Sequence, residues 1–207
     1  MARTKSEATR EKVIQGALRA LCEHGVTATT TRKIAAECSV PLATLHYHFE
    51  SKSALLLAVL DAINEETVVA MRADLRDSVD LAACIAQILR AAWRFIERSR
   101  DLQVVQYELT LYALREDAAW LAERQYESYV RLWRDMLMAT AQRTGELDTA
   151  GSATLARFIL AGFDGLILQE LARPGKTRSR RGIEALVRAA QGYAATLARV
   201  TAPQTAG

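Results

Sequence analysis

The sequence predicts an all-α protein of nine helices, and three observations lead to this fold class. Helical periodicity is nearly continuous along the 207 residues, whereas sustained apolar–polar alternation and Asn-Gly hairpin signals are absent. Glycine and proline are scarce, at ten and three residues, which favours long helices with few turns. Half of the residues are hydrophobic, enough to form a substantial core.

Four helices are predicted in the first third of the chain. Gly25 ends the first of them, as a glycine just past a helix terminus does. Thr30 or Thr31 can cap a short second helix through Cys38. Pro41 suits the start of a third helix that ends near Phe49, and Ser51 can cap the fourth. The apolar stripe of the first helix consists of Val13, Ile14, Ala17, Leu18 and Leu21.

Five further helices are predicted after residue 79, and aspartates stand near three of their starts, where capping and the helix dipole favour them. They span about residues 80–99, 101–115, 117–143, 149–173 and 179–200. Between the last two, residues 175–182 (GKTRSRRG) form an expected basic loop. This loop is either a solvated connector or a contact for nucleic acid.

The two short helices, braced by a longer one, form a predicted helix-turn-helix. The major groove of DNA, about 12 Å wide, admits one helix, so the second short helix must leave one face free. Ile34, Val40 and Leu45 face inward. The residues expected to reach bases or phosphates are Thr31, Arg32 and Lys33 on the first short helix, Thr44, His46, Tyr47 and His48 on the second, and Lys52 on the next.

Two alternatives apply to this segment. His46 and His48 suggest a metal, but residues two apart on a helix point away from each other, so we expect no metal. Tyr47 is either a DNA contact or a core residue. The charge distribution agrees with an anionic partner: residues 1–52 hold eight Lys and Arg against five acids, while the rest of the chain is neutral.

Three sequence features resemble the DNA-binding domain of the tetracycline-repressor (TetR) family over residues 9–60. They are HGV (residues 24–26), TTRKIAAECSV (residues 30–40) and TLHYHFESKSALL (residues 44–56). The resemblance implies DNA contacts by Thr31, Arg32, Thr44, His46, Tyr47, His48 and Lys52. It also implies nine helices, a homodimer and a ligand pocket in each body.

The chain departs from the family pattern at four positions. Ser39 replaces the glycine that is usual in the turn, and His46 replaces a tyrosine. Leu42 and Ala43, at the front of the recognition helix, are apolar where relatives are often polar. Both can touch thymine methyl groups, but their side chains form no hydrogen bonds to bases.

The last two predicted helices carry the expected dimer interface. The eighth is apolar on all sides, with Leu160 and Leu168 opposite its main stripe, so it must be covered on both sides. A partner chain can cover one side in a four-helix interface, or the bundle is wholly intramolecular. The interface residues we predict are Phe158, Gly162, Leu166, Leu186, Ala190 and Leu197.

The middle helices carry the candidate effector pocket, although aromatic residues at helical spacing also suit a core. Glu108 falls on the apolar face of the sixth helix, where it lines the cavity or pairs with an arginine of a neighbouring helix. Asp164 is a second acidic candidate. The predicted lining comprises Trp93, Glu108, Leu111, Tyr112, Trp120, Tyr126, Tyr129, Trp133, Phe163 and Asp164.

The function we predict is a ligand-responsive transcriptional regulator, a repressor released from operator DNA by an unidentified small molecule. A DNA-binding domain in residues 1–52 is followed by an effector-binding and dimerisation domain in residues 53–207. An effector-independent DNA-binding protein, an activator, and a helical carrier or enzyme are the alternatives. We expect no enzymatic activity and no cofactor, because catalytic and metal-binding motifs are missing from the sequence.

The cellular location is predicted from the cysteines and the N-terminus. Three cysteines without metal-ligand spacing indicate a reduced compartment. The polar N-terminus lacks the apolar segment of a secretory signal, and no run of about 18 apolar residues indicates a membrane span. We therefore expect a cytoplasmic protein without a membrane partner.

Overall fold

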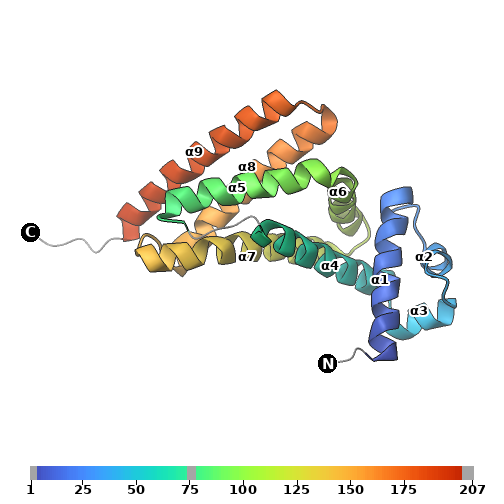
Figure 1. Cartoon of the computed structure of the whole chain (residues 1–207). Coiled ribbons are helices and arrows are strands. Elements are labelled where there is room, and N and C mark those ends of the chain that lie inside the picture. Colours follow the sequence, from blue (N-terminus) through green and yellow to red (C-terminus); the bar gives the residue numbers. More distant parts are fainter. Residues whose placement is uncertain (1–3, 74–77, 202–207) are drawn as a thin grey trace, which may run out of the picture. The chain divides into compact units, whose positions relative to one another are not determined.

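The computed structural model describes residues 4–73 and 78–201, and these residues form nine helices and no strand, as predicted (Figure 1). Residues 1–3 of the polar N-terminus lie outside the described part. The helices are α1 (Lys5–His24), α2 (Thr31–Glu37), α3 (Leu42–His48), α4 (Lys52–Ala73), α5 (Leu81–Arg98), α6 (Arg100–Arg115), α7 (Ala119–Thr144), α8 (Thr149–Ala172) and α9 (Lys176–Thr201).

The chain forms two compact units. Unit 1 comprises Met1–Glu66 and Ser99–Tyr126, and unit 2 comprises Thr67–Arg98 and Glu127–Gly207. Unit 1 therefore contains α6 as well as the predicted DNA-binding segment. The domain boundary between residues 52 and 53 stays a prediction.

Caps and close contacts order the first helices of unit 1. Thr4 and Glu7 form a capping box at the start of α1, and Thr30 rather than Thr31 caps α2 by accepting from the Lys33 N–H at 3.2 Å. Figure 1 shows α2 and α3 beside α1. A Cβ added to Gly16 would lie 2.1 Å from the buried Sγ of Cys38, so this glycine permits the close packing of α1 on α2.

Two helix starts differ from the prediction. Asp117 has a φ of 51°, and α7 begins after it, at Ala119. The expected basic loop at residues 175–182 is wrong, because α9 begins at Lys176. Glu170 explains the early start: its carboxylate accepts from the Gly175 N–H at 3.1 Å and from the Ser179 hydroxyl, which fixes the first turn against the end of α8.

The main seam of unit 2 lies between α8 and α9, which run side by side in Figure 1. Each helix has one glycine that faces a leucine side chain of the other helix. A Cβ on Gly162 would lie 2.5 Å from Leu186, and a Cβ on Gly182 would lie 2.6 Å from Leu166. The two leucines therefore fill the space that the glycines leave.

Candidate nucleic-acid interface and ligand body

The α2–α3 segment separates a buried face from an exposed face. Ile34 and Leu45 are completely buried, which holds α3 against the rest of unit 1. Tyr47 is 82% exposed and its ring packs edge-on against His48, with centroids 5.1 Å apart. The exposed side therefore presents the predicted contact residues, and Tyr47 is not a core residue. Ala43 and His46 are also exposed, while Leu42, Thr44 and His48 are half-buried.

The turn between α2 and α3 explains the usual glycine at position 39. Ser39 has a φ of 50°, in the left-handed region that glycine enters at little cost. Its N–H donates to Ala36 O, and the Val40 N–H donates to Ala35 O at 3.0 Å. The backbone thus makes the same kind of turn with a serine, at a conformational cost.

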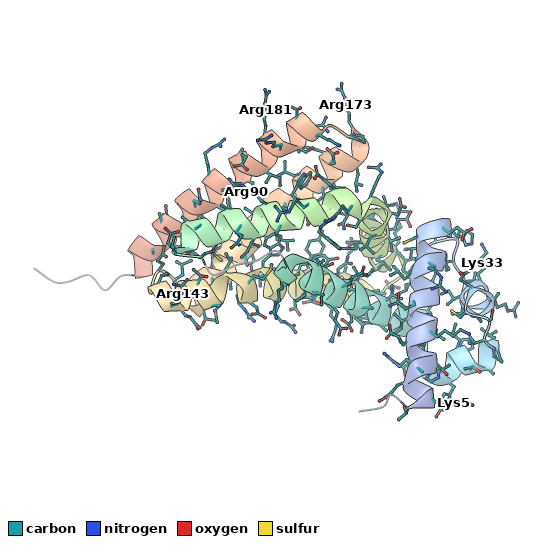
Figure 2. The ribbon with its side chains drawn as sticks, in the orientation of Figure 1. Lys5, Lys33, Arg90, Arg143, Arg173 and Arg181 are labelled. Carbon is teal, nitrogen blue, oxygen red and sulfur yellow. The ribbon has the colours of Figure 1, made fainter. Side chains whose placement is uncertain are left out.

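The start of α2 presents its polar side chains outward. Arg32 and Lys33 are exposed and Thr31 is half-buried. Lys33 lies on the outer side of α2 in Figure 2, and its Nζ donates to Ala28 O at 2.9 Å. Arg32 and Lys33 are thus exposed cations in the same unit as α3.

Lys52 has a different partner from the phosphate that we predicted. Its Nζ donates to Val26 O at 3.0 Å and lies 4.5 Å from the centroid of the Tyr112 ring. Burial lowers the pKa of this amine, and Glu116 opposes that shift. In this structure the charge of Lys52 therefore holds the turn after α1.

Glu108 contacts the same turn, and its predicted place in an effector cavity stays a prediction. Its Oε2 accepts from the buried Val26 N–H at 2.8 Å. A Cβ on Gly25 would lie 3.0 Å from this oxygen, and the φ of Gly25 is 76°. Glycine is therefore required twice, by conformation and by contact. Sequence reasoning missed this link because the partner is a main-chain group.

The ten predicted pocket residues divide between the two units. In unit 2, Trp93, Trp133 and Phe163 form an aromatic cluster, with Phe163 at 5.8 Å from Trp93 and 5.1 Å from Trp133. Tyr129 and Asp164 are half-buried in the same unit. Phe163 thus contacts both tryptophans, and the place of these residues in a pocket stays a prediction.

In unit 1, two of the predicted pocket residues are exposed in the single chain. Leu111 is 53% exposed and Trp120 is 47% exposed, and their place in a pocket stays a prediction. The buried stripe of α6 runs through Gln103, Val105, Leu109 and Ala113, and Leu111 is on another side. Tyr112 and Tyr126 are half-buried.

The predicted dimer residues also separate into two groups. Ala190 is completely buried and Leu186 is 8% exposed within the single chain, where Leu186 packs on Gly162. Leu186 and Gly162 therefore belong to the α8–α9 seam, and the residues of the dimer interface stay a prediction. Phe158 is 38% exposed, with its ring 4.9 Å from that of Tyr193. Leu166 and Leu197 are half-buried.

One described helix, α8, is long and apolar enough for a membrane span by length and composition, with a mean hydropathy of 1.4. Of that apolar window, 44% is buried inside the structure. A core helix of a soluble protein passes the same test. The two-sided apolar character predicted for α8 is therefore present, and part of its apolar surface is uncovered in the single chain.

An exposed recognition helix on a helix-turn-helix, joined to an all-helical body, defines a DNA-binding regulator. The chain belongs to the TetR family: residues 13–59 match the model of bacterial regulatory proteins of the tetR family, and residues 76–192 match the tetracyclin repressor-like C-terminal domain. It is thus a ligand-responsive DNA-binding transcriptional regulator and not an enzyme, as predicted.

Three similar proteins illustrate the family. The nicotine-responsive repressor HdnoR of Paenarthrobacter nicotinovorans is 25% identical over 83% of this chain and 88% of its own. The regulator TtgR of Pseudomonas putida is 29% identical, covering 83% and 85%. The crystal structure of the multidrug binding protein EbrR with imidazole has a TM-score of 0.66 and 27% identity, covering 87% and 89%.

Proposed function

We propose that this protein is a cytoplasmic repressor that binds operator DNA as a homodimer and leaves it when a small molecule binds. The observation that carries the proposal is the face of α3, with Tyr47 82% exposed opposite the completely buried Leu45. A dimer places two such helices in successive major grooves, about 34 Å apart.

The proposed DNA contacts are of two kinds. Arg32 and Lys33, with Thr31, contact phosphates and fix the position of the protein on the duplex. The α3 residues Leu42, Ala43, Thr44, His46, Tyr47 and His48 face the groove. Lys52 takes part through the turn that it holds, because its amine is bonded to Val26 O.

The proposed dimer surface is the uncovered side of α8 and α9. Phe158 and Leu168 are exposed apolar residues at 38% and 50%. Gly165 and Gly192 have open space where a Cβ would stand, so another helix can approach them closely. Two copies of this surface form the four-helix interface that a two-fold axis requires.

The proposed effector site is the aromatic cluster of Trp93, Trp133 and Phe163. Edge-to-face rings present both apolar faces and polarised edges, so they suit a small molecule with an aromatic ring. HdnoR, which is nicotine-responsive, and EbrR, a multidrug binding protein, support such a ligand class. The effector lowers DNA affinity only by as much as it prefers the released conformation.

The test combines operator discovery with a matched pair of variants. Genome-wide mapping of DNA bound in cells supplies the operator, and mobility shifts at fixed salt measure affinity. Tyr47→Ala is expected to weaken operator binding about tenfold or more without changing the oligomeric state. Trp120→Ala removes another exposed aromatic ring and is expected to bind normally. Equal affinity for the two variants would contradict the proposed reading face.

A further inference from the structure

A groove of about 730 Å³ lies between α5 and α9 in unit 2, a volume in the usual range for small-molecule sites. Its apolar lining comes from Trp93 and Ile183. Trp93 is only 5% exposed, and its Nε1 has no hydrogen-bond partner in the structure. The groove thus has an apolar floor formed by two buried side chains.

The charged lining of the groove is mainly cationic. Arg90 and Arg94 come from α5, and Lys176 and Arg180 come from α9. Two carboxylates, Glu97 and Glu184, also line it, so positive charges exceed negative charges by two. Arg90 and Glu184 neutralise each other in a two-bond ion pair, at 2.8 and 2.7 Å.

Cations gather at the start of α9. Lys176, Arg178, Arg180 and Arg181 stand in its first two turns, and its first turn has no acid of its own. The Glu170 carboxylate of α8 supplies negative charge there, because it accepts from the Gly175 N–H and lies 3.6 Å from Arg178. Lys176 and Arg180, which line the groove, are the cations of α9 that face a ligand in it.

We propose that the α5–α9 groove is a binding site for a small organic anion. A carboxylate, sulfonate or phosphate group contacts Arg94, Lys176 and Arg180, while the apolar part of the molecule lies against Trp93 and Ile183. The site contains no residue of the α3 reading face, and it shares Trp93 with the aromatic effector cluster. Binding of an anion to the groove can therefore be measured in the absence of operator DNA.

The groove fits a small anion better than a nucleic acid backbone. Glu97 and Glu184 stand among the cations and would repel a continuous row of phosphates. A single anionic group can reach the cations of α9 and leave the carboxylates to accept hydrogen bonds from its polar substituents. Trp93 also contacts Phe163, with ring centroids 5.8 Å apart. A ligand in the groove therefore contacts a residue of the aromatic cluster.

Two dyes of similar shape test the charge requirement. Anilinonaphthalene sulfonate is the anionic probe, and phenylnaphthylamine is its uncharged counterpart. Fluorescence titrations use the full-length protein in low and high salt. The double variant Arg94→Gln/Arg180→Gln is expected to bind the anionic dye about tenfold more weakly, and the neutral dye with unchanged affinity. High salt should reduce the difference between the two proteins.

A second double variant provides the matched control. Arg173→Gln/Arg181→Gln removes the same charge from residues that project away from the ribbon in Figure 2 and do not line the groove. It should bind the anionic dye like the unmodified protein. Thermal unfolding of all three proteins checks that the fold is retained.

Three outcomes would overturn the proposal. The first is an equal loss of affinity for the anionic dye in both double variants, which would indicate general charge attraction. The second is an equal loss of affinity for both dyes in the groove variant, which would indicate an altered apolar site. The third is operator binding reduced by the groove variant alone in the absence of any dye, which would assign these arginines to nucleic acid.

Discussion

At the scale of single residues, the main-chain conformation at Ser39 shows how the turn forms without the glycine that is usual in the family. The turn between α2 and α3 requires a positive φ whichever residue occupies it, and Ser39 adopts 50°. The left-handed region costs a non-glycine residue about 1–2 kcal/mol, while glycine loses about 0.5–1 kcal/mol through its larger unfolded-state entropy. Serine is therefore the less stable choice, although it preserves the turn.

We expect Ser39→Gly to raise the free energy of unfolding by about 0.5–1 kcal/mol. The physical reason is relief of the left-handed conformation alone, because a glycine has no side chain to pack. Urea denaturation measures the change. Ala36→Gly, on the exposed side of the neighbouring helix α2, is the control and should lower stability by about 1 kcal/mol. A loss of stability in both variants would show that the conformation of Ser39 is not strained.

Prediction of single residues from the sequence succeeded where helical periodicity alone determines whether a side chain is buried or exposed. Tyr47 was placed on the reading face by its position opposite Leu45, and the structure agrees. Glu108 was recognised as an acid on an apolar face, but its partner was missed. Periodicity identifies side-chain faces, whereas Glu108 and Lys52 both bond to main-chain atoms of Val26, which no side-chain pattern reports.

At the scale of elements, α6 and the turn after α1 form one assembly. The N–H of Val26 donates to Glu108, and its carbonyl accepts from Lys52, which also lies over Tyr112. Two opposite charges thus hold one residue of the backbone. Since α6 belongs to the same unit as α1–α3, any movement of α6 acts directly on the segment that orients the reading helix.

We expect Glu108→Ala to lower stability by about 1.5–3 kcal/mol, because the buried Val26 N–H would lose a charged acceptor. Glu108→Gln retains an acceptor oxygen and should recover most of the loss. Urea denaturation distinguishes the two variants. If alanine and glutamine were equally destabilising, the charge of Glu108 would matter more than its hydrogen bond.

Helix starts were predicted closely where the sequence contains a recognisable capping residue. Ser51 accepts from the Ala54 N–H at the start of α4, and Asp80 accepts from the Ala83 N–H at the start of α5. The start of α9 was missed because Gly175 and a run of cations look like a loop. A carboxylate from the preceding helix, Glu170, completes that turn, and such a contact between helices is not visible in local sequence.

At the scale of the whole molecule, the proposed dimer surface is the uncovered side of α8 and α9. Phe158 carries the central exposed ring of that surface. We expect Phe158→Glu to give monomers, because two like charges would face each other across a two-fold axis. Light scattering after size exclusion measures the mass. Val79→Glu, at an exposed position outside these helices, should remain dimeric; a dimer of Phe158→Glu would place the interface elsewhere.

The thiols report the integrity of the whole fold. Cys22 is exposed, whereas Cys38 and Cys84 are buried, and burial raises the pKa of both buried thiols. A raised pKa reduces the thiolate fraction at a pH of about 8, so these two react slowly for two reasons. We expect one thiol to react with a disulfide reagent in the native protein and all three cysteines to react in urea. Rapid native reaction of every thiol would indicate frequent opening of the core.

The link at Val26 also bears on how such regulators diversify. Glu108 and Lys52 bond to the main chain of Val26 and not to its side chain, and Gly25 supplies the conformation that brings Val26 within reach. The side chains of α2 and α3 are therefore free to change without altering this attachment. A chimera that carries another regulator's recognition segment on this body should keep its effector response, provided that the Gly25 turn and Lys52 are retained, and should answer to a new operator.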